Sequence, residues 1–169
     1  VMNPNYTLFR RCADTLQFLF ESSWWQEYCK KYKPDNLIAL GAGATSKDLI
    51  AIDALLSNGA DTISHTIIDY SSSMLESSIF ELSDRLIDSG LIPQVESNAL
   101  KTDFTQLQEG LIRTTNFSSV YYLLGGTVGN VNESALFLSI ASVAKNDDVF
   151  LIFLECTPEN MDDQTVKLA

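Results

Sequence analysis

The feature that most constrains this sequence is a regular alternation of apolar runs with amphipathic segments beyond residue 36. Apolar runs predict strands over 37–40, 64–68, 120–124 and 149–154, and a weaker pattern predicts a strand over 94–100. Helical spacing of apolar residues predicts helices over 46–56, 73–87, 104–112 and 133–143. Because runs that are apolar throughout are typical of parallel strands, we predict an α/β fold. It is a Rossmann-like, doubly wound, mostly parallel sheet with helices on both faces.

The first part of the chain follows a different pattern. Residues 6–32 carry apolar side chains at helical spacing and are predicted to form one helix, which Pro34 ends. We therefore expect an N-terminal helical segment over 1–35 and a Rossmann-like core over 36–169. Since the chain begins with Val1, we expect it to be a fragment or a processed product.

Charge and composition limit the partners. The chain has 22 acidic and 11 basic residues, a net charge of −11, which disfavours nucleic acids and anionic membranes. No apolar run approaches the ~20 residues of a membrane span, and the N-terminus lacks the pattern of a signal peptide. We expect a cytoplasmic protein with reduced cysteines and a small-molecule substrate, without nucleic-acid or membrane partners.

Glycines follow the first and fourth predicted strands, at the ends where ligands bind in doubly wound sheets. Residues 41–46 (GAGATS) form a turn that lets a ligand approach the backbone and the start of a helix. Residues 124–131 (LGGTVGNV) contain three glycines, which suggests a second close approach to a ligand. The alternatives are a tight strand-to-helix turn and a plain connector.

An aspartate follows each of the second and third predicted strands. Asp69 lies near the position where an acid binds ribose hydroxyls in nucleotide-binding folds. Asp103, with Phe104 beside it, is suited to hydrogen-bonding and flanking a nucleobase. Both aspartates could instead cap the helices that follow.

Together these loops resemble a class I S-adenosylmethionine-dependent methyltransferase. Residues 68–75 (IDYSSSML) look like the family's second motif, an acid that closes strand two before a serine-rich turn. Residues 124–131 are similar to the GSTIGNF segment of the histidine-specific N-methyltransferases of the ergothioneine pathway. Residues 40–47 (LGAGATSK) resemble that group's LGSGTSxK. The resemblance extends over about residues 36–155.

This resemblance implies S-adenosylmethionine as the cofactor and assigns residues to it. The residues placed on the cofactor are Gly41, Ala42, Gly43, Thr45, Lys47, Asp69, Tyr70, Asp103, Phe104, Gly125, Gly126 and Thr127. Gly41 and Gly43 would face its methionine part, and Asp69 its ribose. Asp103 and Phe104 would hold the adenine. Gly126 and Thr127 would line the reacting end, where Asn130 would bind the substrate's polar head.

The sequence departs from the family pattern at three points. Ala39 stands where the family's first strand usually has an acid, so one polar contact toward the cofactor is missing. Residues 1–35 show no clear counterpart of the group's N-terminal segment. Only five strands are predicted where the family has seven, so we expect an incomplete domain. A homodimer mate or a missing C-terminal domain would then cover the apolar edge of the fifth strand.

The function expected is transfer of a methyl group to a small molecule, such as the α-amino group of histidine or a related amino acid. The protein would act mainly by orienting the reactants, so no catalytic residue is assigned and no metal site is expected, His65 included. The alternatives are a non-catalytic cofactor-binding module and a nicotinamide-dependent Rossmann enzyme.

Overall fold

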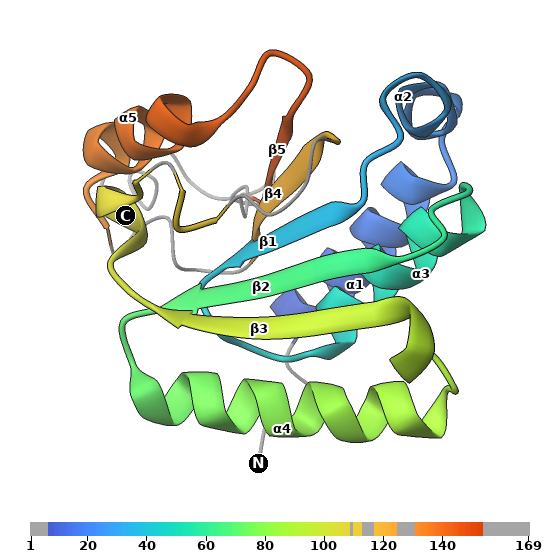
Figure 1. The fold of residues 1–169 in the computed structure, drawn as a ribbon, viewed down its shortest axis with the longest axis horizontal. Coiled ribbons are helices and arrows are strands. Elements are labelled where there is room, and N and C mark those ends of the chain that lie inside the picture. Colours follow the sequence, from blue (N-terminus) through green and yellow to red (C-terminus); the bar gives the residue numbers. More distant parts are fainter. Residues whose placement is uncertain (1–6, 109, 113–116, 125–130, 154–169) are drawn as a thin grey trace, which may run out of the picture.

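Five parallel strands form one sheet, as predicted. The computed structural model describes residues 7–108, 110–112, 117–124 and 131–153. The strands are β1 (Asn36–Leu40), β2 (Ile63–Asp69), β3 (Val95–Lys101), β4 (Ser119–Leu124) and β5 (Val149–Phe153), in the order β3-β2-β1-β4-β5 (Figure 1). The chain builds outward from β1 to β3 and then crosses back to β4, so the direction of winding changes between β1 and β4. Ligands of doubly wound sheets bind at this switch point.

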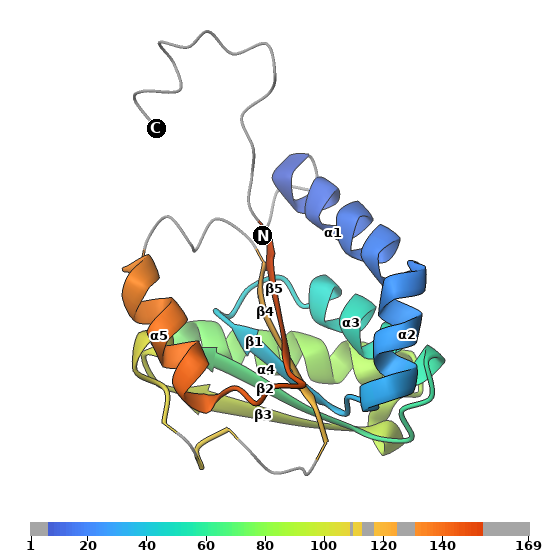
Figure 2. The ribbon, with the colours of Figure 1, turned by 90° about the horizontal axis from the view of Figure 1, so that it is seen from above.

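Helices cover both faces of the sheet, which confirms the predicted layers (Figure 2). The helices α1 (Thr7–Phe20), α2 (Ser23–Tyr32), α3 (Ser46–Ser57) and α4 (Ser72–Asp88) share one core with the sheet. The opposite face packs on α5 (Glu133–Val143) and on the short 3-10 helix η2 (Phe104–Gln106). A second 3-10 helix, η1 (Ile92–Gln94), leads into β3.

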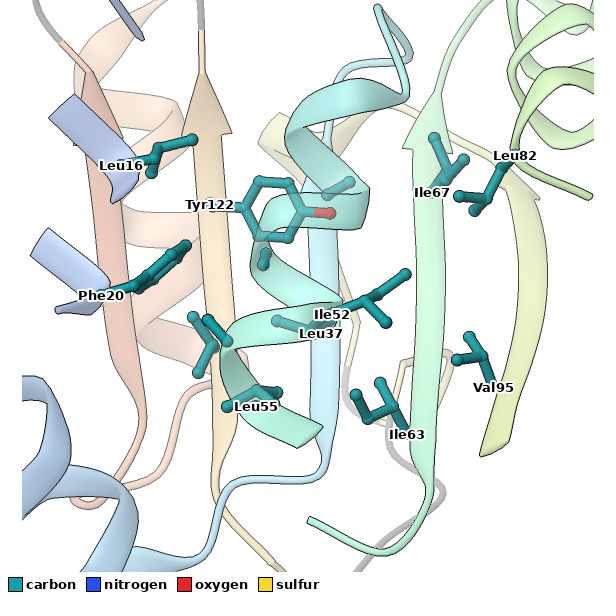
Figure 3. Close-up of a cluster of buried hydrophobic side chains, with 14 of the residues drawn as sticks. Leu16, Phe20, Leu37, Ile52, Leu55, Ile63, Ile67, Leu82, Val95 and Tyr122 are labelled. Carbon is teal, nitrogen blue, oxygen red and sulfur yellow. The ribbon is translucent and has the colours of Figure 1, made fainter. Parts of the chain in front are cut away.

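The two cores lie on opposite faces because strand side chains alternate. On the α3 face, Leu37 of β1 packs near Ile52 and Leu55 of α3 (Figure 3). On the α5 face, Ile38 and Leu40 of β1 join Leu136 of α5. Trp25 of α2 is fully buried in the α3-face core, so the N-terminal helices are packed onto the sheet.

The single helix predicted over 6–32 is wrong, because the chain breaks into α1 and α2 at Ser22. The Ser22 hydroxyl donates to the Leu19 carbonyl at 2.6 Å and accepts from the Trp25 N–H at 3.2 Å. It therefore satisfies polar groups at the end of one helix and caps the start of the next.

The helix predicted over 104–112 is also wrong. Among the described residues of this range the structure has only the 3-10 helix η2, after which Leu107 is extended. The Leu107 N–H donates to Ser139 Oγ of α5 at 2.7 Å instead of continuing a helical ladder. A bond to a distant helix has thus replaced the local helical pattern.

The strand β5 forms one edge of the sheet. It pairs with β4 on one side, and its five residues are all apolar and partly buried. The other edge strand, β3, contains the polar residues Glu96, Ser97, Asn98 and Lys101. Polar edges discourage further strand pairing, whereas apolar edges invite it.

Candidate active site at the carboxyl ends of the strands

The predicted glycine turn lies at the carboxyl end of β1, at the centre of this edge. Gly41 adopts a φ of 91°, which favours glycine. Its N–H donates to the Ile68 carbonyl at 2.8 Å and so ties the turn to β2. The Gly43 carbonyl accepts from Ser78 Oγ of α4 at 3.2 Å. The turn is therefore held from two elements before α3 begins.

Asp69 ends β2 beside this turn, and its carboxylate is half-buried. Oδ2 accepts the Ala42 N–H and Oδ1 accepts the Ser71 N–H, both at 2.7 Å. Asp69 thus joins the glycine turn to the loop that starts α4, where Ser71 is the N-cap. Since each carboxylate oxygen accepts more than one hydrogen bond, the capping contacts leave acceptor capacity for a ligand. Tyr70 is 76% exposed on the same rim.

Asp103 and Phe104 follow β3 and have structural partners of their own. Asp103 Oδ1 accepts the Thr105 N–H at 2.8 Å and the Thr105 hydroxyl at 2.6 Å, so it caps η2. The Phe104 ring is buried in the α5-face core. The capping alternative therefore describes Asp103 in this structure, and Phe104 packs in the core rather than beside a ligand.

Lys47 reaches from the first turn of α3 to the end of β4. Its Nζ donates to the Leu124 carbonyl at 2.5 Å. Burial lowers the pKa of the Lys47 ammonium, which opposes smaller raising effects from Cys12 and Asp48. The lysine holds the strand end from which residues 125–130 continue.

Two hydroxyls at the start of α3 have no hydrogen-bond partner within the described part of the chain. They are the buried Oγ1 of Thr45 and Oγ of Ser46. Buried polar atoms normally have partners, and unpaired ones beside a glycine turn and a helix start are free to bind a polar ligand.

A buried polar cluster that was not predicted from the sequence lies beneath this turn. The Tyr122 hydroxyl of β4 donates to Asp48 Oδ1 of α3 at 2.5 Å and lies 2.9 Å from His65 Nε2 of β2. Figure 3 shows the Tyr122 side chain extending beneath α3. Titratable residues at inward positions of apolar strands were the available signal for His65 and Tyr122.

Four predicted site residues lie outside the described residues: Gly125, Gly126, Thr127 and Asn130. Among the described residues, the turn after β1, Asp69, Asp103 and the end of β4 all lie at the carboxyl edge of the sheet. The flanking residues Leu124 and Val131 are described on either side of the glycine loop.

Within the described ranges, no group of histidine, cysteine or acidic side chains is arranged to hold a metal ion. The helices in those ranges are also too short or too polar to cross a membrane.

The geometry leaves several nucleotide-binding families open, and comparison with known families decides among them. The family of histidine-specific, S-adenosylmethionine-dependent methyltransferases matches residues 7–167. The chain belongs to this family. No curated protein matches it. The match begins in α1, so the N-terminal helices belong to the family region, contrary to the limits inferred from the motifs.

The residues at this edge fit the family's cofactor, S-adenosylmethionine. The carboxylate of Asp69, the unpaired Thr45 hydroxyl and the open turn at Gly41 suit its ribose and polar groups. The family match goes against a nicotinamide-dependent enzyme.

Proposed function

We propose that this chain transfers a methyl group from S-adenosylmethionine to the α-amino group of histidine or a related amino acid. The family match supports the type of reaction. The site assignment rests on the Asp69 carboxylate. It accepts hydrogen bonds from the glycine turn and from the loop that starts α4, at the edge where ligands of doubly wound sheets bind. The identity of the methyl acceptor is proposed from the family description, which names histidine.

The cofactor would lie across the carboxyl ends of the strands. Asp103 and Phe104 at β3 would hold the adenine, and Asp69 and Tyr70 at β2 the ribose. The turn residues Gly41, Ala42 and Gly43, with Thr45 and Lys47, would bind the methionine part. Gly125, Gly126 and Thr127 would line the reacting end, and Asn130 the substrate. These assignments remain predictions.

The bound cofactor supplies an activated methyl group on a sulfonium. The protein then has to hold the acceptor nitrogen in line with that methyl group. It also has to bind the acceptor amine in its unprotonated form. The net charge of −11 favours approach of a cationic cofactor. No side chain needs to form a covalent intermediate.

Binding of the cofactor tests the site assignment. We expect Asp69→Ala to weaken S-adenosylmethionine about tenfold to a hundredfold, because hydrogen bonds to a charged group are the stronger ones. Titration calorimetry measures the dissociation constant, with circular dichroism as a check on folding. Asp61→Ala, at an exposed aspartate before β2, is the matched control. An unchanged dissociation constant in Asp69→Ala would remove the ribose assignment.

A panel of amino acids tests the acceptor. The native protein, with cofactor, should methylate histidine or a close relative faster than other amino acids, as measured by mass spectrometry of the products. Cofactor binding without turnover on any amino acid would favour the non-catalytic module instead.

We further propose that another polypeptide segment covers the apolar edge of β5, either a second copy or a C-terminal domain. Support comes from its five partly buried apolar residues. Light scattering of the native chain and of Ile152→Lys distinguishes the two, since only a dimer through this edge would dissociate in the variant. We also propose a cytoplasmic location and the division into segments 1–35 and 36–169.

A further inference from the structure

The cluster of Asp48, Tyr122 and His65 has no role in the function proposed so far. Asp48 is 7% exposed, and the other two side chains are also buried, on the α3 face of the sheet. His65 Nε2 also lies 3.7 Å from Asp48 Oδ1. Taking a carboxylate out of water is unfavourable unless it is paired, so a group placed here needs a partner.

The hydrogen bonds in this cluster run in one direction. A carboxylate accepts, so the Tyr122 hydroxyl donates to Asp48, and burial raises the pKa of that phenol well above its ordinary value. Because the Tyr122 proton points at Asp48, its oxygen accepts from His65, and Nε2 of His65 carries the hydrogen. Two buried groups behind the carboxylate thus fix its orientation.

The cluster reaches the edge of the sheet at which the strands end. Asp48 and Tyr122 line a small cavity at the carboxyl ends of β1 and β4. Its remaining lining residues are Leu40, Gly41, Gly43, Ala44, Lys47 and Leu124. The cavity therefore lies directly beneath the glycine turn.

Lys47 and Asp48 place opposite charges side by side in this cavity. Lys47 Nζ donates to the Leu124 carbonyl and not to its neighbour's carboxylate. Each charge thus keeps bonding capacity for a third group. An α-amino acid, with an ammonium and a carboxylate on one carbon, has the complementary pair of charges.

We propose that Asp48 binds the α-ammonium group of the cofactor's methionine part, oriented by Tyr122 and His65, while Lys47 faces its carboxylate. This inference rests on the proposed function. Asp103 and Asp69 place the adenosine end of an elongated cofactor over β3 and β2, so its amino-acid end comes to β1 and β4. Ala39, which pairs in register with Tyr122, offers no polar group there, and Asp48 supplies one from α3.

Ligands with and without the amino-acid end test this role. S-adenosylmethionine and S-adenosylhomocysteine carry the ammonium, whereas 5′-methylthioadenosine lacks the whole amino-acid end. In Asp48→Asn, a variant of nearly equal shape, we expect the first two to bind about tenfold to a hundredfold more weakly. The affinity for 5′-methylthioadenosine should be unchanged. Calorimetry on the native protein and the variant gives all six dissociation constants.

A second variant keeps the test decisive if Asp48→Asn does not fold. Tyr122→Phe retains the carboxylate and removes the hydroxyl that orients it. We expect a smaller loss of affinity, again confined to the ligands that carry the ammonium.

The outcomes separate the two proposals. If the native protein binds none of the three ligands, the proposed function fails and this inference fails with it. If the native protein binds all three but the variants weaken them equally or not at all, Asp48 is structural and only this inference is overturned.

Discussion

The two faces of the sheet differ in the kind of side chain that they bury. The α3 face holds the buried residues Asp48 and His65, together with Tyr122 and the half-buried Lys47. The α5 face has an apolar cluster, with Ser139 binding one backbone N–H. The same strands supply both faces, so alternation along β1, β2 and β4 separates the polar cluster from the second core.

Side chains that bind a ligand and side chains that stabilise the fold therefore lie largely on different faces of the sheet. Buried charges contribute little net stability compared with apolar side chains of similar size. The α5 face stabilises the sheet mainly by burying apolar surface. Changes on the α5 face away from Phe104 should alter stability without altering ligand binding.

The largest expected effect is on the α5 face. Leu136 is fully buried, and we expect Leu136→Ala to lower the free energy of unfolding by about 2–5 kcal/mol through lost burial and a cavity. Urea denaturation measures the change. The matched control is Leu138→Ala on the same helix, where the side chain is 72% exposed and the change should stay within about 0.5 kcal/mol. Equal losses in both variants would contradict the assigned core.

A smaller loss is expected on the α3 face. Tyr122→Phe leaves the Asp48 carboxylate without its 2.5 Å hydrogen bond, which should lower the free energy of unfolding by about 1–3 kcal/mol. Tyr70→Phe, at an exposed position, is the control and should be neutral. A neutral Tyr122→Phe would show that the cluster is satisfied in another way.

The smallest expected effect is a response to alkaline pH that belongs to the α3 face. Burial raises the pKa of the Cys29 thiol from 9.0 to about 11. Above the lower value the unfolded chain loses this proton while the folded chain keeps it, so stability falls as pH rises between the two pKa values. At about pH 10 this loss is about 1 kcal/mol.

Comparison with Cys29→Ala isolates this contribution. The unfolding free energy of the variant should fall by about 1 kcal/mol less between about pH 8 and about pH 10. Buried Cys12 and Tyr122 also have raised pKa values, so a residual alkaline loss should remain. An identical pH dependence in the two proteins would contradict the prediction.

The strand pattern could be predicted from the sequence because it is local. All five strands and the helices α3, α4 and α5 lie close to their expected ranges, since each buries a continuous or periodic apolar set. The two errors have one cause: polar side chains formed bonds that periodicity does not encode. Ser22 divided the first helix, and Ser139 took the N–H that would have continued η2.

The site was predictable where loops follow strands and not where side chains meet across the fold. Gly41 and Asp69 were found because topology places loops after parallel strands at one edge. Asp48 looked like an ordinary residue in the first turn of a helix. The proposed role of Asp48 depends on its hydrogen bond to Tyr122, which is 74 residues away in sequence. The two residues come into contact only after β4 has paired with β1.

That pairing has a consequence for the order of folding. The strands β1, β2 and β3 are neighbours in sequence as well as in the sheet, so they can pair early, whereas β4 must return to the far side of β1. Closing so long a loop is slow relative to local pairing. Several contacts can form only after β4 has paired with β1. They are those of Tyr122 with His65 and Asp48, and that of Lys47 with Leu124. We expect a folding intermediate that has half of the sheet to lack this side of the binding site, so that the ability to bind cofactor appears last in refolding.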